Sequence, residues 1–291
     1  MKRLLITAAI LLTACSGASS DAPETIEVET PAVATTEAVQ APMTLADAIA
    51  HPRRADDAAR DKFRNPQATL DFFDIAPGQT VAEIWPGWYT QILAPYLANN
   101  DGTYVAVLLP DGVSDRVDER NASFKEKYGD TAAYGTLGYG SYSKDAGLSL
   151  ADNSIDTILT FRNVHNWMGG GYAEEAFAEF ARALKPGGTL GIVEHRLPET
   201  RTQDPKGSSG YVQESYMKAL AAEAGLEFVA SSDVNANALD TADHPMGVWT
   251  LPPRSRLPED GSADANGFDA ELYLNIGESD RATLKFRKPA E

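Results

Sequence analysis

The sequence predicts an α/β protein with a doubly wound, mostly parallel sheet of seven strands. Candidate strands and helices alternate from about residue 66 to residue 287, separated by turns rich in Gly and Pro. The apolar run at 154–161 has the pattern of a strand buried on both faces of a parallel sheet. Because ligands of such sheets bind beyond the carboxyl ends of the strands, we expect the functional site there.

The expected elements follow one another along the folded part of the chain. Asn65-Pro66 opens a short helix, since proline suits the first helical position. Apolar residues at helical spacing stop at Lys185-Pro186-Gly187-Gly188, which indicates a helix end. The expected strands cover residues 80–85, 103–109, 132–137 (the weakest), 154–161, 189–194, 226–234 and 282–287. The expected helices cover about residues 66–73, 88–97, 114–128, 172–184 and 211–224.

Two segments lie outside this alternation. Residues 44–60 have the pattern of an N-terminal helix, in a position to cap the ligand cleft. Residues 235–280 form a long insertion before the last strand, and so long a connection is usually functional or disordered. Its stretch Trp249-Thr250-Leu251-Pro252-Pro253 favours an ordered cover.

The N-terminus has the features of a lipoprotein signal peptide over residues 1–15. Lys2 and Arg3 precede an apolar stretch, Leu4 to Leu12, that is too short for a bilayer, which needs about 20 helical residues. Leu12-Thr13-Ala14-Cys15 matches a lipobox, so Cys15, the single cysteine of the chain, is the expected lipidation site. We therefore expect a lipid-anchored protein of the cell envelope; Ser16 favours the outer membrane, facing the periplasm. An ordinary signal peptide with a chance cysteine is the alternative.

The composition of residues 16–291 indicates two regions and limits the possible partners of the protein. Residues 16–42 are expected to be a flexible acidic linker, because their few apolar groups show no period, and residues 43–291 suffice for one domain. The formal net charge of −17 becomes −19 when Lys2 and Arg3 leave with the signal peptide. Such acidity disfavours nucleic acid and anionic lipid headgroups, so we expect no nucleic-acid partner, but it says nothing positive about the substrate. The oligomeric state is not predicted.

Three spaced segments carry a family resemblance: the strand, turn and helix at Val81–Leu97, then Asp152–Asp156, then Leu184–Gly188. Together they resemble the class I S-adenosylmethionine (SAM) dependent methyltransferases. Further segments are similar to a "predicted methyltransferase" family of exported bacterial proteins, namely 83–87, 93–97, 161–167, 194–196, 247–253 and 277–281. The resemblance implies a Rossmann-like fold, SAM as cofactor, and methyl transfer to a small-molecule or envelope acceptor.

The resemblance implies that the turn after the first strand holds SAM, with Glu83 as the acidic residue and Gly87 as the remaining glycine. Trp85 and Tyr89 stand where ordinary methyltransferases carry glycine, and the turn looks shortened. Glu83 ends a buried strand, so its carboxylate needs a partner, either the ligand or local backbone N–H groups. We favour the ligand.

Two further carboxylates are candidate cofactor residues. The family usually has a carboxylate directly after the second strand for the ribose hydroxyls, but Val107-Leu108-Leu109 stand there and Asp111 follows. Asp111 is equally well explained as a turn residue in Pro110-Asp111-Gly112. Asp145 matches the acidic position near adenine.

The candidate catalytic residues are Arg162, Asn163, His165 and His195. They follow two strands that we expect to be neighbours, so the two histidines, of four in the chain, are expected to face one cleft. Either imidazole would serve as general base, typically worth about 10²–10⁴-fold. The alternative is a structural network that fixes loop geometry.

Two other interpretations concern the same region. His165, His195 and Glu194 have the residue types of metal ligands, but no HxxxH spacing is present and we predict no metal site. Trp85, Trp88, Tyr89 and Trp167 would suit an aromatic pocket for a cation, and core packing explains at least two of them equally well.

The function therefore has three candidates. One is methyl transfer from SAM, and the second is a non-catalytic ligand-binding lipoprotein that reuses the methyltransferase fold. The third is a structural lipoprotein with a degenerate pocket. The polar clusters at 162–167 and 194–196 favour a working site over the third. The turn at Trp85 and the missing ribose carboxylate favour the second and the family resemblance favours the first, and we predict methyl transfer, with the non-catalytic ligand-binding protein as the alternative.

Overall fold

The computed structural model describes residues 42–290. The expected signal peptide, the lipidation site Cys15 and nearly all of the expected linker lie outside the described residues. No helix in 42–290 combines the length and the apolar character needed to cross a membrane.

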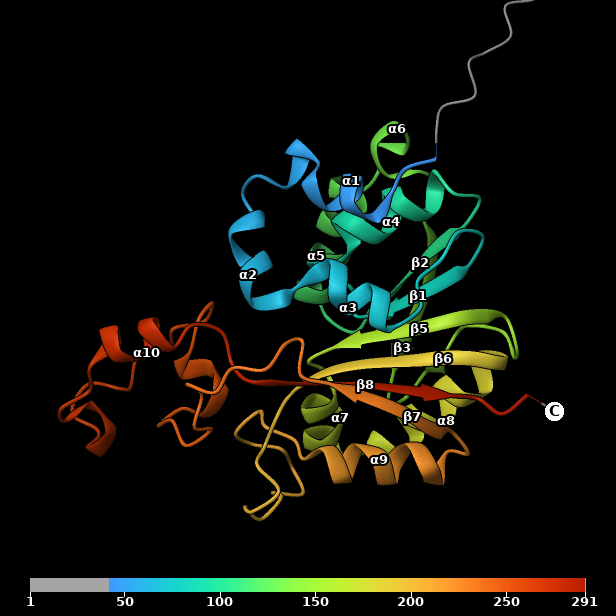
Figure 1. The fold of residues 1–291 in the computed structure, drawn as a ribbon. Helices are drawn as coiled ribbons and strands as arrows, with labels where there is room; N and C mark the ends of the chain where they lie inside the picture. Colours follow the sequence, from blue (N-terminus) through green and yellow to red (C-terminus); the bar gives the residue numbers. More distant parts are fainter. Residues whose placement is uncertain (1–41, 291) are drawn as a thin grey trace, which may run out of the picture. The chain divides into compact units, whose positions relative to one another are not determined.

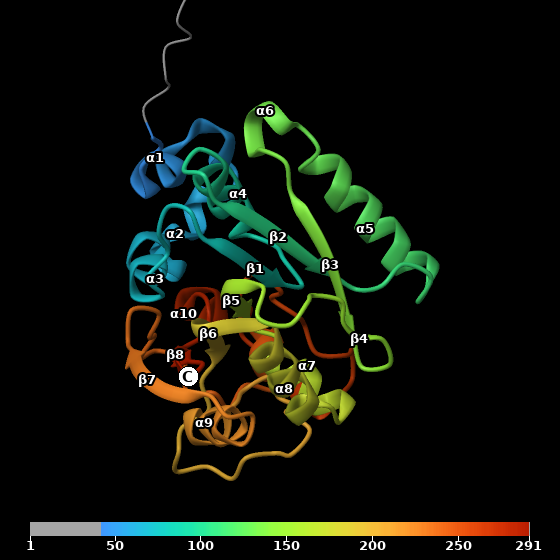
Figure 2. The same ribbon diagram turned by 90° about the vertical axis from the view of Figure 1, so that its right-hand side faces the viewer.

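One mixed sheet of eight strands forms the centre of the fold, in the order β4-β3-β2-β1-β5-β6-β8-β7 (Figures 1 and 2). The strands β3, β2, β1, β5 and β6 are parallel, and β8 runs antiparallel between β6 and β7. The strands are β1 Thr80–Ile84, β2 Thr103–Leu108, β3 Gly138–Ser143, β4 Gly147–Leu148, β5 Ile155–Phe161, β6 Leu184–His195, β7 Glu227–Ser232 and β8 Arg281–Arg287. The predicted fold class is confirmed, with one more strand than expected, because the two-residue β4 is too short for any periodic signal.

Helices cover both faces of this sheet, as the class requires. In Figure 1, α1, α3 and α4 lie above the sheet and α7, α8 and α9 below it. Each layer shares one apolar cluster with the sheet, the first around Leu93 and Phe73 and the second around Trp167 and Phe180. The helices are α1 Leu45–Ala50, α2 Asp61–Arg64, α3 Pro66–Phe72, α4 Thr90–Ala98, α5 Asp115–Lys127, α6 Thr131–Tyr134, α7 Val164–Gly170, α8 Ala173–Ala183, α9 Glu214–Glu223 and α10 Ala270–Ile276.

The prediction of a strand at 132–137 is wrong. Asp130 caps the short helix α6 by accepting hydrogen bonds from Ala132 N and Ala133 N, and Gly135 ends the helix with a φ of 72°. The strand β3 begins only at Gly138. Local capping chemistry therefore overrides the apolar residues that suggested a strand.

The predicted helix at 44–60 is also not continuous. Thr44 and Asp47 form a capping box that starts α1, but His51 precedes a proline and is extended (φ −63°, ψ 133°). Two 3₁₀ turns, Pro52–Arg54 and Ala58–Arg60, follow. The end of this segment, rather than a capping helix, reaches the cavity described below.

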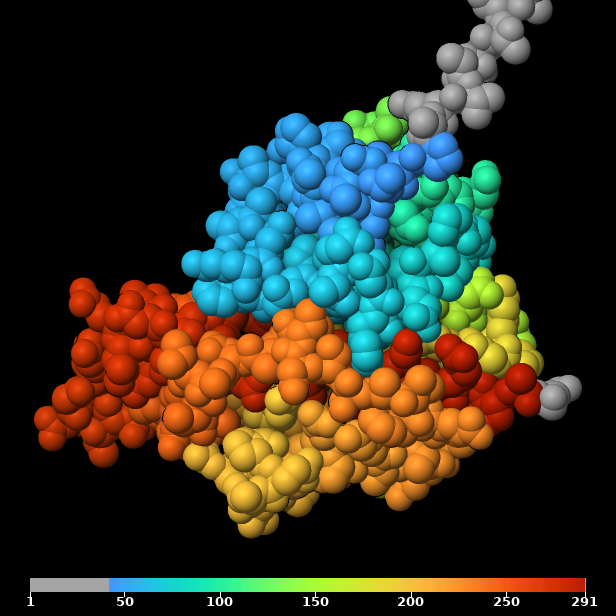
Figure 3. Space-filling model, viewed as in Figure 1, coloured from blue at the N-terminus to red at the C-terminus, as the bar shows by residue number. Residues whose placement is uncertain are grey.

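Two segments at the carboxyl edge of the sheet shape the site. The cluster predicted as a loop after β5 is the helix α7. The insertion 235–280 contains the 3₁₀ turns Gly247–Thr250 and Ala263–Ala265 and helix α10, and it forms a lobe, orange to red in Figure 3. Residues 248–254 of this insertion cover the cavity, which makes it an ordered cover as expected.

Candidate functional site

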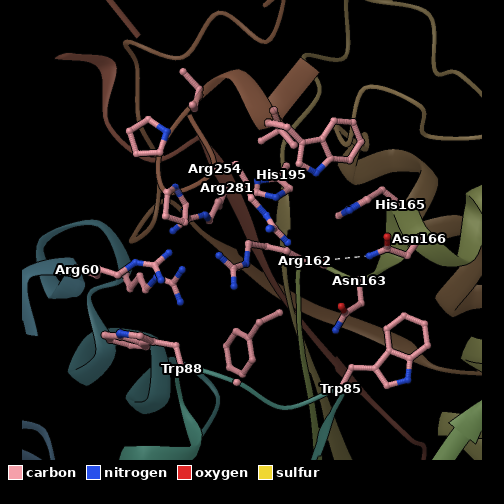
Figure 4. A pocket seen from close by; sticks show the side chains of 18 of the residues that line it. Arg60, Trp85, Trp88, Arg162, Asn163, His165, Asn166, His195, Arg254 and Arg281 are labelled. Atoms are coloured by element: carbon pink, nitrogen blue, oxygen red, sulfur yellow. Dashed lines mark hydrogen bonds between the residues drawn. The ribbon is translucent and has the colours of Figure 1, made fainter. Parts of the chain in front are cut away.

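The main candidate site is a cavity of about 550 Å³ at the carboxyl ends of β1, β5 and β6. The four predicted catalytic residues, Arg162, Asn163, His165 and His195, all line it (Figure 4). The sequence prediction did not include the arginines at 60, 64, 254 and 281, which line the same cavity. Trp249 and the neighbouring residues of the insertion complete the wall.

His165 is held by the buried carboxylate of Glu194. Its Nδ1 lies 3.1 Å from Glu194 Oε1, and Glu194 Oε2 accepts a hydrogen bond from Val164 N at 2.6 Å. A carboxylate accepts hydrogen bonds, so Nδ1 is the nitrogen that donates to Glu194, and Nε2 lies on the other side of the ring. Glu194 thus fixes both the start of α7 and the orientation of the His165 ring, which lines the cavity.

His195 is the second imidazole at this wall, and the two ring centroids lie 5.6 Å apart. Its Nδ1 lies 2.5 Å from Ser279 Oγ, and its backbone N–H donates to Glu194 Oε1. Burial holds the pKa of His195 well below its ordinary value, and the positive charges of Arg281 and Arg162 act in the same direction. His195 is therefore a neutral hydrogen-bonding group rather than a cation.

The other two predicted catalytic residues differ in how they are held. Asn163 donates from Nδ2 to the carbonyl of Ile84 and to Thr160 Oγ1, so it clamps the ends of β1 and β5 together. Arg162 has a φ of 64°, and its backbone N–H donates to Val193 O. This conformation is unusual for a residue with a Cβ, and the sheet contact maintains it. Within 42–290, the Arg162 side chain makes no hydrogen bond or ion pair, and it projects into the cavity in Figure 4.

His165, Glu194 and His195 also form the residue set of a metal site, with ligand atoms within 4.8 Å of one another. Sequence spacing gave no sign of this cluster, since β6 and α7 bring the residues together. Both Glu194 oxygens already accept backbone N–H groups. Arg162 and Arg281 line the same cavity, and their charges oppose a cation there.

At the end of β1, the predicted cofactor residue Glu83 has hydrogen-bond partners within the protein. The carboxylate of Glu83 is buried and accepts hydrogen bonds from Tyr104 Oη at 2.7 Å, from Gly87 N at 3.1 Å and from Thr90 Oγ1 at 3.5 Å. Burial raises the pKa of Glu83 to about 7, with these hydrogen bonds acting against the rise. Within the described residues its partners are these local groups, and the predicted contact with a ligand stays a prediction. Gly87 itself lines the cavity, and a Cβ there would meet no protein atom within 4 Å.

Trp85, which follows β1, lies across the carboxyl end of the neighbouring strand β2. It adopts a φ of 50°, its backbone N–H donates to Val107 O in β2, and its indole N–H donates to Tyr142 O in β3. The side chain therefore crosses the carboxyl end of β2, where it packs against Tyr142 and Trp167.

The remaining predicted cofactor residues lie apart from the main cavity. Asp111 accepts from Asn121 Nδ2 at 2.7 Å, pairs with Lys125 at 3.3 Å, and borders a separate cavity of about 300 Å³. That cavity shares no lining residue with the main one. Asp145 is exposed in the turn between β3 and β4. Neither Asp111 nor Asp145 therefore lines the main cavity, and their role toward SAM stays a prediction.

The four predicted pocket aromatics divide into two pairs. Trp85 and Trp88 line the main cavity, and the guanidinium carbons of Arg54 and Arg64 lie 4.8 and 4.9 Å from the Trp88 ring centroid. Tyr89 and Trp167 are core residues: Tyr89 stacks on Phe161 at 4.0 Å, and Trp167 is fully buried. The cations that contact the Trp88 ring are therefore arginines of the protein itself.

Comparison with protein families matches residues 87–192 to the methyltransferase domain family. This match and the fold confirm the resemblance to the class I SAM-dependent methyltransferase superfamily, so the protein is methyltransferase-like. The match begins at Gly87, after the strand that carries Glu83 and the turn that carries Trp85. Comparison with curated proteins finds no match.

Solved structures similar to this chain include a SAM-dependent methyltransferase from Aquifex aeolicus, with 19% identity over 66% of this chain and 94% of that one (TM-score 0.45). A SAM-dependent methyltransferase from Methanosarcina mazei is 12% identical over 76% and 97% of the two chains (TM-score 0.45). A "possible exported protein" from Bordetella parapertussis is 16% identical over 80% and 68% (TM-score 0.44).

Proposed function

We propose that this protein is a cell-envelope lipoprotein that reuses the methyltransferase fold to bind a small molecule and to remove a proton from it. The observation that carries the proposal is the pair of Glu194 and His165, in which the buried carboxylate orients the imidazole at the wall of a cavity of small-molecule size. His195 and Asn163 border the same space with polar groups.

The proton transfer follows from the hydrogen bonds that His165 and His195 make. His165 Nε2 accepts a proton from a hydroxyl, amine or acidic C–H of the bound molecule, and the ring becomes an imidazolium. Glu194 keeps its hydrogen bond to Nδ1 and stabilises the new positive charge. His195, neutral and paired with Ser279, is placed to hydrogen-bond the substrate rather than to compete for the proton.

The test starts from a ligand found by thermal unfolding against small polar metabolites, followed by turnover of that ligand. His165→Gln should lower the turnover rate by about 10²–10⁴-fold with little change in melting temperature. His51→Gln, which removes an imidazole outside the cavity, is the matched control and should keep full activity. Equal turnover in His165→Gln and the unchanged protein would exclude the base role.

Methyl transfer from SAM to a small-molecule or envelope acceptor is the second candidate, and the family match over residues 87–192 favours it. Thermal unfolding with SAM and with S-adenosylhomocysteine separates the two candidates. A ligand at 100 times its Kd adds about 2.7 kcal/mol, roughly 5–10 °C for a domain of this size. The closed path at Trp85 leads us to expect no such shift; a shift of that size would put methyl transfer first.

The envelope location rests on the sequence pattern that ends at Cys15. Diacylation and N-acylation of this cysteine would anchor the protein stably, because more than one acyl chain is needed for a lasting membrane attachment. Cys15→Ala should abolish incorporation of labelled palmitate and release the protein from the membrane fraction. Continued labelling of the Cys15→Ala variant would contradict the anchor.

A further inference from the structure

The wall of the cavity opposite His165 is built from arginines of three distant segments, and a fourth segment, the insertion 235–280, adds Arg254 to the lining. Arg60 and Arg64 come from the N-terminal segment, Arg162 follows β5, and Arg281 begins β8. Figure 4 shows Arg162 between Arg60 on one side and His165 on the other. Of the residues that line this cavity in the described part of the chain, none is Asp or Glu.

One carboxylate behind the wall holds three of these arginines. Glu278, 2% exposed, pairs through Oε1 with Arg60 Nε at 2.6 Å and through Oε2 with Arg64 Nε at 3.2 Å and with Arg281 Nη2. Arg162 has no such partner in residues 42–290. The cluster therefore carries more positive charge than the protein itself neutralises.

The same arginines have donors without partners. Arg64 and Arg281 are each only 3% exposed, yet Arg64 Nη2 and Arg281 Nε make no hydrogen bond among the described residues, and neither does Arg60 Nη2. Buried donors without acceptors are costly, so an acceptor supplied by a bound molecule would stabilise this cluster. Burial, with the charges of Arg64 and Arg281 adding to it, lowers the pKa of Arg162 to about 9, as expected for a cation short of counter-charge.

We propose that this cavity recognises its ligand through an oxyanion, a carboxylate or a phosphate, bound by Arg60, Arg64, Arg162 and Arg281. The proposal uses the same cavity as the proposed function but does not depend on His165 acting as a base. Guanidinium groups bind both oxyanions through paired hydrogen bonds. The charge contrast supports it, since a chain of net charge −17 gathers these arginines around one cavity.

The position of the oxyanion also defines the orientation of the ligand. Its charged end lies against the arginines, its body lies along Trp88, Phe161 and Trp249, and its other end reaches the imidazole wall. A small molecule with a single anionic end and a hydroxyl or amine several bonds away fits this arrangement. A net cation does not, because the wall repels it.

The experiment measures thermal unfolding of the purified protein in rising sodium phosphate and, separately, sodium succinate, with chloride holding the ionic strength constant. We expect a saturable rise in melting temperature with at least one of the two anions. Arg162→Gln and, independently, Arg60→Gln at the partly exposed rim should weaken that binding by roughly tenfold to a hundredfold. Arg120→Gln removes the same charge from the exposed face of α5 and should leave the response unchanged.

The two anions identify the ligand chemistry, because the tighter one names the group that the arginines prefer. No saturable rise with either, or equal rises in the unchanged protein and both cavity variants, would overturn the proposal. His165→Gln should keep the full anion response. Loss of turnover without loss of the anion response therefore concerns the proposed base alone, and loss of the anion response in Arg162→Gln concerns the oxyanion site alone.

Discussion

At the β1–β2 end of the sheet the buried carboxylate of Glu83 is fully partnered by the protein, whereas at the β5–β6–β8 end buried guanidinium donors are not. Trp85 crosses the carboxyl end of β2, between a cavity of about 300 Å³ beside β2 and β3 and the cavity of about 550 Å³ at the ends of β5 and β6. In the usual arrangement of this fold the first region would receive the cofactor. The difference teaches that unpartnered buried donors gather on the second side, whereas the Glu83 carboxylate on the first side has partners within the protein.

Substitution of Glu194 has the largest expected effect, because its carboxylate holds the start of α7 and both histidines at the cavity wall. Glu194→Ala leaves Val164 N, His195 N and His165 Nδ1 without their acceptor in a fully buried place. We expect a loss of about 3–5 kcal/mol in the free energy of unfolding, measured with denaturant. His165→Gln removes only the ring and should cost much less; similar losses in both would mean that His165 itself holds the fold.

The pH dependence of stability should have opposite signs on the two sides. Burial raises the pKa of Glu278, but the attraction of Arg281 and Arg64 outweighs it and lowers the pKa from 4.5 to about 2. Between these values the unfolded chain binds more protons than the folded one, so stability falls as the pH falls through this window. The shift corresponds to about 3 kcal/mol.

Glu83 shifts the other way, because burial raises its pKa from 4.5 to about 7. The folded protein then binds more protons between these values, so stability falls as the pH rises from about 4.5 to 7, by about 2–3 kcal/mol. Unfolding of the unchanged protein, Glu278→Gln and Glu83→Gln from pH 2 to 8 resolves the two slopes. Each variant should remove only its own slope, and loss of both slopes in one variant would mean that the two sides are coupled.

Trp85 offers a direct way to remove the difference between the two sides. Trp85→Gly loses the contacts with Tyr142 and Trp167 but relieves a left-handed φ of 50°, so we expect a net loss of about 1–3 kcal/mol. Opening the end of β2 should give a melting response to S-adenosylhomocysteine that the unchanged protein lacks. Trp85→Phe keeps an aromatic ring and serves as the control. A response in all three proteins would show that Trp85 closes nothing.

The sequence was sufficient for the strands in the centre of the sheet, whose signals are local, but it misplaced β3 and missed β4. The run at 154–161 and the stop at Lys185–Gly188 correctly indicated β5 and the end of α8. It was insufficient for α7, whose two glycines are poor helix formers, because Glu194 from β6 supplies the acceptor at its start. It was likewise insufficient for the arginine wall, since Arg60 and its partner Glu278 are 218 positions apart.

The sequence contains one feature of the arginine wall, the segment Gly277 to Arg281, whose structural role its pattern did not predict. Gly277 to Arg281 belongs to the segments that carry the family resemblance, and it contains both Glu278 and Arg281. Two opposite charges at this spacing suggest a local pair, and the structure does contain that pair. Only the fold reveals that the same carboxylate also binds Arg60 and Arg64, which turns a local pair into one side of a cavity.

Substitution of Asp111 has the smallest expected effect, and it tests whether the cavity beside β2 takes part in ligand binding. Its carboxylate is exposed, paired with Asn121 and Lys125, and borders a cavity separate from the main one. Those hydrogen bonds lower its pKa, but solvent screens such a surface pair, so Asp111→Asn should leave the melting temperature essentially unchanged. It should also leave unchanged the response to phosphate or succinate. Loss of any ligand response in Asp111→Asn, measured by the same unfolding experiment, would mean that the two cavities act as one and that the ribose role implied by the family resemblance is real.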